Sequence, residues 1–333
     1  MNNEPLVLLV GFGSIGRRHL RNLRALGVPD QRIIVARTGR STLPDDELTG
    51  VTVVSDLAAA LAHQPRATII ANPTSLHLAT ALAAAQAGSS VFMEKPIAYS
   101  LDGVDQLRSL VEQKALTFFV GFQFRFHPGL RQVKQWLDGA QIGKIIHVQV
   151  HWGEYLPDWH PWEDYRQSYS ARADLGGGVV LTLSHPLDYV RWLVGDVTRV
   201  FASLGYQGLD IEAEDTADIH LEFAQGAIGH VHLDYVQRPS SHTLRITGTE
   251  GSIRWDNADG IAHCYRAAAQ TWESVAPAPD FERNRLFLDE LQHFLACIAG
   301  EAAPLCTFDD GVRALEIALA AKQSAALGQA LTL

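Results

Sequence analysis

Residues 1–121 alternate between short apolar runs and longer segments with helical periodicity. Short continuous apolar runs are typical of strands buried on both faces, and apolar residues three or four positions apart are typical of amphipathic helices. Such an alternation predicts a parallel sheet covered on both faces, which is a doubly wound α/β domain. The predicted strands are 6–10, 32–36, 51–54, 67–71, 91–93 and 117–120, and the predicted helices are 15–26, 56–62, 76–87 and 101–114.

From residue 122 onward the pattern changes to alternating polar and apolar positions, which are typical of strands with one exposed face. We expect an α+β domain with an open, mostly antiparallel sheet. The domains are therefore predicted as 1–121 and 122–333, with the C-terminal helix able to pack back on the first. The predicted strands are 144–152, 197–204, 217–223, 227–235, 242–247 and 251–256, between helices at 128–137 and 310–327.

Charge and composition narrow the classes of partner. Lysine and arginine total 27 against 37 aspartates and glutamates, so the 333-residue chain has a formal net charge of −10. Nucleic acids and anionic membranes attract basic surfaces, so neither is an expected partner. The chain has no apolar run long enough for a membrane span, and the run at 6–10 is too short for a secretion signal. Its three cysteines show no metal-binding spacing, and we expect reduced thiols in a cytoplasmic protein.

A glycine-rich loop follows the first predicted strand and opens the first helix. Gly11, Gly13 and Gly16 form a G-x-G-x-x-G pattern that contains Ser14 and Ile15. Glycines at these places allow a tight turn and a close approach of the backbone to a pyrophosphate, which lies on the helix N-terminus. The strand–turn–helix context predicts a Rossmann dinucleotide-binding domain.

The end of the second predicted strand indicates which dinucleotide binds. A fold selective for NAD places Asp or Glu there to hold the ribose hydroxyls, but residues 35–40 contain no carboxylate. Arg37, Thr38 and Arg40 instead offer groups that pair with a 2′-phosphate. We therefore expect NADP, with NAD as the alternative. A solvated basic loop is the other interpretation of these residues.

Hydride transfer at a carbinol carbon needs a group that takes or returns the hydroxyl proton. No tyrosine here is followed by lysine four residues on, which excludes a Tyr-x-x-x-Lys pair. His147 and His151 share one face of a predicted strand, as do His230 and His232, but no cysteine lies near them. We expect solvated or cross-strand roles for these histidines and no metal site.

Two other segments offer groups for this chemistry. Glu94, Lys95 and Pro96 close the fifth strand at the edge where α/β folds bind ligands, so Lys95 can face a nicotinamide, unless it forms only a surface ion pair with Glu94. Three glycines at 176–178 precede His185, which follows an apolar run and, taken alone, is also typical of a core histidine.

Further motifs lie at 71–74 with His77, at 121–126 and at 248–251. In their order along the chain, all these motifs resemble the Gfo/Idh/MocA family (glucose-fructose oxidoreductase, inositol dehydrogenase, rhizopine catabolism). The resemblance implies a Rossmann domain and an open-faced sheet domain through which members commonly form oligomers, here a homodimer or homotetramer. It also implies that Lys95 and His185 act at the nicotinamide. The other cofactor residues that it indicates are Asn72, Pro73, Thr74, His77 and Glu94. It also implies that Arg125, which we expect to bind substrate, lies near the domain junction. The motifs are 11–16, 71–74 with His77, 94–96, 121–126, 176–178 with His185, and 248–251.

One position departs from the family pattern. The family usually has an aspartate four residues after the last glycine, where this chain has Thr182. Threonine can bond a substrate hydroxyl but carries no charge, so Thr182 is expected only as a substrate contact. In the expected mechanism, Lys95 polarises the substrate oxygen and His185 exchanges its proton, because histidine titrates near neutral pH.

The segment 152–172 interleaves aromatic residues with charged ones. Aromatic faces pack against the C–H face of sugar rings, and charged groups bond their hydroxyls. Trp159, Tyr165 and Arg166 are therefore expected substrate-binding residues, although a subunit interface is the alternative for this segment. The predicted function is an NAD(P)-dependent oxidoreductase acting on a sugar, inositol or nucleotide-sugar-like polyol. The alternatives are an NAD-dependent glycoside-cleaving enzyme of the same fold and a non-catalytic dinucleotide sensor.

Overall fold

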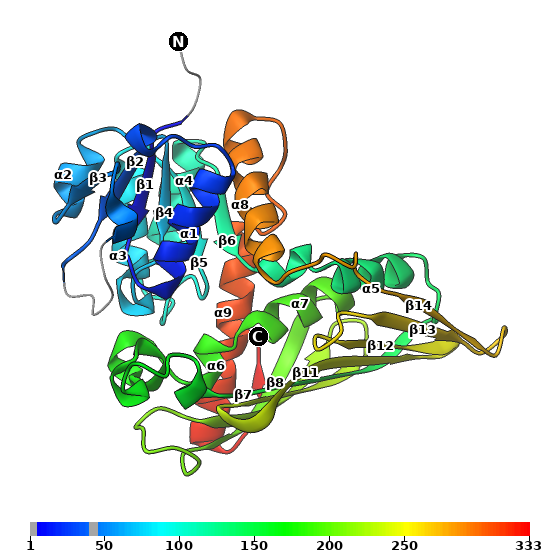
Figure 1. The fold of residues 1–333 in the computed structure, drawn as a ribbon. Coiled ribbons are helices and arrows are strands. Elements are labelled where there is room, and N and C mark those ends of the chain that lie inside the picture. Colours follow the sequence, from blue (N-terminus) through cyan, green and yellow to red (C-terminus); the bar gives the residue numbers. More distant parts are fainter. Residues whose placement is uncertain (1–4, 40–45) are drawn as a thin grey trace. The chain divides into compact units, whose positions relative to one another are not determined.

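The computed structural model describes residues 5–39 and 46–333, which divide into two compact units (Figure 1). Unit 1 comprises the chain up to Gln123 together with Arg283–Val312, and unit 2 comprises Phe124–Glu282 and Arg313–Leu333. Unit 1 therefore includes a segment from late in the sequence.

Unit 1 is built on a parallel sheet of six strands among its described residues, in the order β3-β2-β1-β4-β5-β6. This order is the doubly wound Rossmann topology, as the alternating pattern predicted. The order in which strands are added to the sheet changes direction between β1 and β4, where Val10 pairs with Ile70. The strands are β1 (Val7–Val10), β2 (Ile33–Ala36), β3 (Thr52–Val54), β4 (Ala67–Ile70), β5 (Ser90–Glu94) and β6 (Phe118–Gly121).

The helices of unit 1 begin and end close to the predicted places. Gly27 and Gly88 follow two of them with φ of +84° and +79°, the left-handed conformation expected just past a helix. Helix α8 (Asn284–Ala299) was not predicted from the sequence. It packs on α1 (Ser14–Ala25), with Asn284 Nδ2 donating to Asn22 Oδ1 at 2.9 Å. The others are α2 (Leu57–Leu61), α3 (His77–Gln86) and α4 (Val104–Gln113).

Unit 2, all of which is described, contains a nine-stranded sheet in the order β14-β13-β12-β11-β7-β10-β9-β8-β15. Its neighbouring strands are antiparallel except for β7 and β10, so the prediction of a mostly antiparallel sheet is confirmed. The strands are β7 (Ile145–Tyr155), β8 (Val197–Gly205), β9 (Thr216–Phe223), β10 (Ile228–Asp234), β11 (Val236–Gly248), β12 (Gly251–Asp256), β13 (Ala262–Arg266), β14 (Thr271–Val275) and β15 (Leu331–Thr332).

The two faces of this sheet differ in polarity. Buried side chains such as Val150, Leu233 and Trp255 alternate along the strands with exposed or half-buried ones. Helices α5 (Pro128–Asp138), α6 (Val179–Thr182) and α7 (His185–Val194) contact the strands of this sheet. We call the face that carries the exposed residues the outer face.

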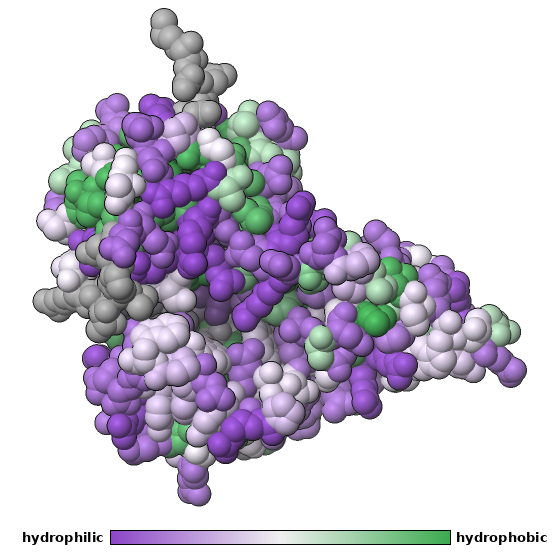
Figure 2. All heavy atoms as spheres, in the orientation of Figure 1, coloured by the Kyte–Doolittle hydropathy of each residue, from purple (hydrophilic) through white to green (hydrophobic). Residues whose placement is uncertain are grey.

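The side of the molecule shown in Figure 2 is mostly polar. Hydrophilic residues cover most of it, with scattered hydrophobic patches. Helix α9 (Phe308–Leu327) is the longest described helix, and no described helix is long and apolar enough to cross a membrane.

Candidate functional site

The carboxyl ends of β1 and β4 meet where the sheet order reverses, and Gly11 lies at this point. Its φ is +95°, and a Cβ added there would lie 2.6 Å from the carbonyl carbon of Ala71 and from the backbone nitrogen of Asn72. A Cβ on Gly16 would clash with the carbonyl oxygen of Gly11. These glycines therefore let the turn, the next strand end and the helix pack without side chains between them.

The first turn of α1 is open to solvent. Gly13 is its N-cap residue, and a Cβ there would contact nothing within 4 Å. Ser14 begins the helix and is exposed, Ile15 is half-buried, and the first turn contains no acidic residue. Unpaired backbone N–H groups and the positive end of the helix dipole can thus face an anion here, which fits the pyrophosphate of a dinucleotide.

The loop after β2 lies at the same edge of the sheet. The backbone N–H of Arg37 donates to the carbonyl of Val54 at 3.0 Å, and its guanidinium lies 5.8 Å from the ring centroid of Phe12. Arg37 is half-buried and Thr38 is exposed, so both can reach a ligand at this edge. Arg40, the third residue predicted to contact the cofactor phosphate, lies outside the described residues.

The segment after β4 is tied to the segment after β5 by a buried histidine. His77 begins α3, and its two ring nitrogens lie 2.9 Å from the carbonyl oxygen of Asn72 and 2.8 Å from that of Pro96. Burial lowers the pKa of His77, because the imidazolium loses its hydration, while the two carbonyls act in the opposite direction. Pro73 and the buried Thr74 lie in the turn between β4 and α3, whose position this histidine fixes.

Glu94 ends β5 as a buried carboxylate. Its Oε1 lies 2.7 Å from His19 Nε2 on α1, which joins the strand end to the helix of the glycine loop. Lys95 follows as a half-buried residue at the same edge of the sheet. A second buried carboxyl group, Glu290 of α8, also interacts electrostatically with Glu94, and its pKa is raised, first by burial and then by this charge.

His185 begins α7 in unit 2 and is 3% exposed. Its ring centroid lies 5.2 Å from that of Phe124 and 5.8 Å from that of Trp152, so aromatic rings fix its orientation. Thr182 ends the short helix α6 and is 3% exposed, and burial raises the pKa of Tyr235 well above its usual range. Both residues are therefore held in a well-packed part of unit 2.

Arg125 and Asp188 form an ion pair that is almost fully buried, with side chains 3% and 2% exposed. The Arg125 Nε donates to Asp188 Oδ2 at 2.9 Å and its Nη2 donates to Oδ1 at 2.6 Å. Asp188 lies three residues after His185 on α7. The pair therefore ties the segment 123–126 to the turn of α7 that contains His185.

The aromatic segment forms short helical turns rather than one regular element. Trp159 lies 5.7 Å from Tyr235 between ring centroids, and its indole N–H is buried with no hydrogen-bond partner among the described residues. Tyr165 is half-buried. Arg166 is exposed, and its Nε donates to Asp164 Oδ1 at 2.8 Å.

The structure thus brings the described cofactor-binding residues predicted from sequence together at the carboxyl edge of the parallel sheet in unit 1. Lys95 belongs to that unit, whereas Arg125, Trp159, Thr182 and His185 belong to unit 2. Sequence reasoning missed two carboxyl-linked contacts, His19 with Glu94 and Glu290 with Glu94. The signal for Glu290 was a charged residue between Phe287 and Leu291 in an otherwise apolar helix stripe.

Comparisons with known proteins agree with the fold described above. A family model described as "Oxidoreductase family, NAD-binding Rossmann fold" matches residues 6–122, and one described as "GFO/IDH/MocA C-terminal domain" matches residues 130–254. The chain is 28% identical to scyllo-inositol 2-dehydrogenase (NAD(+)) of Bacillus subtilis, over 97% of this chain and 95% of the relative. It is 27% identical to myo-inositol 2-dehydrogenase of Thermotoga maritima, over 95% of each.

Solved structures share the fold along the whole chain. Levoglucosan dehydrogenase in complex with NADH superposes with a TM-score of 0.87 at 22% identity and covers 98% of both chains. The WlbA dehydrogenase from Bordetella pertussis, in complex with NADH and UDP-GlcNAcA, has a TM-score of 0.82 at 24% identity and covers 99% of both. At sequence identities of 22% and 24%, these two structures show that the fold is shared.

Proposed function

The chain belongs to the Gfo/Idh/MocA family of oxidoreductases, with an NAD-binding Rossmann fold, and from this premise we propose its reaction. It transfers a hydride between a nicotinamide dinucleotide and a carbinol or carbonyl carbon of a sugar, inositol or nucleotide-sugar-like substrate. The observation that carries this proposal is the glycine cradle at the reversal of the parallel sheet, where Gly11, Gly13 and Gly16 leave backbone open to a pyrophosphate.

We propose NADP as the preferred cofactor, with NAD as the alternative that the name of the Bacillus relative specifies for that protein. The support is the loop after β2, where Arg37 and Thr38 stand in place of a carboxylate. The guanidinium pairs with a 2′-phosphate, and Asp or Glu would repel it.

The test compares the dissociation constants of NADP and NAD by fluorescence titration. Arg37→Asp is expected to weaken NADP binding at least about tenfold, because it removes a charged hydrogen bond and adds a repulsive charge. Lys144→Asp, the same charge change at an exposed residue of unit 2, is the control. Tighter NAD than NADP binding by the unmodified protein would contradict the proposal.

We assign the proton chemistry to Lys95 and His185. Lys95 donates a hydrogen bond that polarises the substrate oxygen, and His185 exchanges the hydroxyl proton. The nicotinamide supplies the hydride acceptor or donor. The aromatic contacts of His185 and the Arg125–Asp188 pair orient the imidazole, and Thr182 can hydrogen-bond a substrate hydroxyl.

Lys95→Ala and His185→Ala proteins should bind cofactor and yet lose about 10²- to 10⁴-fold in turnover, the usual contribution of a general acid or base. Lys144→Ala and His263→Ala are matched controls outside the assigned site. The assay follows absorbance of the reduced cofactor with inositols, levoglucosan and uronic-acid nucleotide sugars. Near-normal turnover in both variants overturns the roles. Substrate cleavage without net reduced cofactor would indicate the glycoside-cleaving alternative, and binding without turnover would indicate the sensor.

The segment 152–172 is proposed as the substrate-contacting segment. The unpartnered indole N–H of Trp159 is a donor that a substrate hydroxyl can satisfy. Trp159→Phe should therefore raise KM about 2- to 12-fold with a smaller effect on kcat, because it removes one hydrogen bond. Trp162→Phe, at a neighbouring exposed position, is the control. Equal KM effects of the two variants would count against this contact.

We also propose that the chain assembles as a homodimer or homotetramer through the outer face of the nine-stranded sheet.

A further inference from the structure

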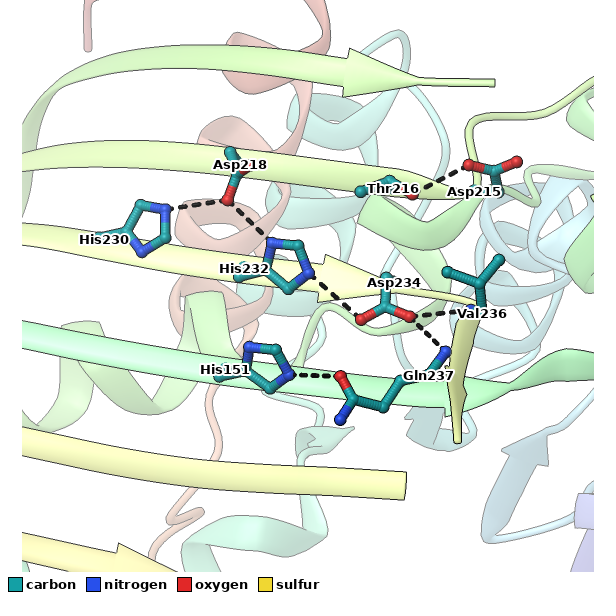
Figure 3. A network of polar contacts seen from close by, with 9 residues as sticks. All are labelled: His151, Asp215, Thr216, Asp218, His230, His232, Asp234, Val236 and Gln237. Atoms are coloured by element: carbon teal, nitrogen blue, oxygen red, sulfur yellow. Dashed lines mark hydrogen bonds and ion pairs between the residues drawn. The ribbon is translucent and has the colours of Figure 1, made fainter. Parts of the chain in front are cut away.

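A cluster of histidine and aspartate side chains lies on the outer face of the nine-stranded sheet (Figure 3). His151 on β7 and His232 on β10 are direct partners in the register of the two strands. Their rings stack, with centroids 4.8 Å apart and planes 15° from parallel. The sequence did not show this pair, because 80 residues separate its members and only the pairing of β7 with β10 joins them.

A carboxylate completes the cluster. Asp234 lies two positions after His232, so it is on the same face, and its Oδ2 lies 3.2 Å from His232 Nε2. Its other oxygen accepts hydrogen bonds from the backbone N–H groups of Val236 at 2.8 Å and Gln237 at 2.6 Å. The turn therefore fixes the carboxylate, whose side chain is 5% exposed, and aims one oxygen at the histidines.

The other ring nitrogen of His232, Nδ1, also has a fixed partner. Asp218 on β9 lies 2.8 Å from His232 Nδ1 and 2.9 Å from His230 Nε2 through the same oxygen, Oδ1. A carboxylate on Nδ1 holds that nitrogen protonated and directs Nε2 toward a ligand, as carboxylates do behind metal-bound histidines. Gln237 Oε1, 2.8 Å from His151 Nε2, places a further oxygen beside the cluster.

We propose that His151, His232 and Asp234 bind a divalent transition-metal ion, with Zn²⁺ as the best match. One ligand atom from each residue lies within 4.8 Å of the others. In a tetrahedral zinc site with bonds of about 2.0–2.1 Å, the ligand atoms lie roughly 3.3 Å from one another. Side-chain rotation has to supply the difference from the separations in this cluster. Two imidazoles and one carboxylate suit zinc, whereas Mg²⁺ and Ca²⁺ require mostly oxygen ligands. Gln237 or water fills the fourth position.

The position of the site indicates a structural role. β7 and β10 run parallel, whereas the other neighbouring strand pairs of this fully described sheet are antiparallel. Parallel pairing is slightly less stable per residue. A metal ion held by one side chain of β7 and two of β10 cross-links that pair, and it binds the folded unit but not the unfolded chain.

The experiment uses the full-length protein after dialysis against EDTA. We expect isothermal titration with ZnCl₂ to show one equivalent per chain and Zn²⁺ to raise the melting temperature. Cobalt(II) should give visible absorption bands of a site with nitrogen ligands. His151→Ala and His232→Ala should abolish the stoichiometric site, and Asp218→Asn should weaken it about 10- to 100-fold through its effect on His232.

The matched controls are His230→Ala and His147→Ala. His230 lies on the same strand and face as His232 and shares Asp218, and His147 lies on β7 opposite Ile228, so both should retain zinc binding. Circular dichroism of each metal-free variant checks the fold. His151→Ala is the decisive variant, because the imidazole of His151 bonds the neutral amide of Gln237. Removing this imidazole therefore leaves no carboxylate without its partner. No stoichiometric binding by the unmodified protein overturns the proposal, as does binding that is equal in the His151→Ala protein or equally lost in both controls.

Discussion

Glu290 is a carboxyl group that the fold shields completely from water. Its side chain is 0% exposed, and neither oxygen has a hydrogen-bond partner among the described residues. Burial raises its pKa well above the usual range, the charge of Glu94 raises it further, and Arg18 acts in the opposite direction. Burial and the neighbouring charge of Glu94 therefore both favour the neutral form of Glu290.

A pKa that is raised in the folded state makes the stability depend on pH. The contribution of Glu290 to the free energy of unfolding is fully present below the unfolded-state pKa of about 4.3, and it is lost as pH rises through the folded-state pKa. Glu290→Gln keeps the neutral shape and should therefore raise the melting temperature at pH 8, with no gain near pH 4. Melting curves from pH 4 to 8 measure this, with the exposed Glu301→Gln as control. A gain that is independent of pH would contradict it.

The Arg125–Asp188 pair is the second test at the scale of single residues. Removing Asp188 leaves a buried guanidinium without its partner, so Asp188→Ala should cost about 3–5 kcal/mol of unfolding free energy. Urea unfolding measures the loss. Asp289→Ala breaks the more exposed Arg285–Asp289 pair and should cost about 0–1 kcal/mol. Similar losses of unfolding free energy in the two variants would mean that burial does not make the Arg125–Asp188 pair more costly to break.

At the scale of elements, the glycine loop separates packing from ligand binding. Gly11→Ala forces a side chain at φ +95° against the backbone of Ala71, so it should lower the melting temperature and abolish dinucleotide binding. Gly13→Ala meets open space, so it should leave the melting temperature unchanged and still weaken dinucleotide binding. Thermal melts and fluorescence titrations test both. Full dinucleotide affinity in the Gly13→Ala protein would place the pyrophosphate elsewhere.

The same elements show what the sequence predicts and what it does not. The strands of unit 1 were predictable because each lies in a short run of mostly apolar or β-branched residues, and β7 to β12 because their polar and apolar residues alternate. Strands β13, β14 and β15 were not predicted. In β14 the exposed Trp272 and its polar neighbours carry no buried stripe. Helix α8 was missed, and its packing partner is α1, more than 250 residues earlier.

The candidate site divides in a similar way. The glycines, Asn72 and Lys95 follow strand ends directly, so local sequence order places them at one edge of the sheet. The contacts of His185 with Phe124 and Trp152, and the pairing of His151 with His232, depend on how distant segments pack. Sequence periodicity contains no information about which strands become neighbours, so these contacts were not predicted.

At the scale of the whole molecule, the net charge of −10 bears on the proposed assembly. Copies with a uniform negative surface would repel each other, but the outer face of the nine-stranded sheet carries both signs, as in the Arg199–Glu222 ion pair at 3.0 Å. It also exposes Phe201 at 39% and Ile228 at 57%. Mixed charge with exposed apolar residues is compatible with contact between copies of this face.

Light scattering coupled to gel filtration tests this assembly. The unmodified protein should elute with two or four times the chain mass of 36.5 kDa. A Phe201→Glu, Ile228→Glu double variant should elute as a monomer, because it adds charge to the apolar part of the outer face. Leu101→Glu, a 43% exposed residue of unit 1, is the control and should retain the oligomer. An oligomer that survives the double variant and dissociates in the control would assign the interface to unit 1, because the apolar surface that holds copies together would then lie there.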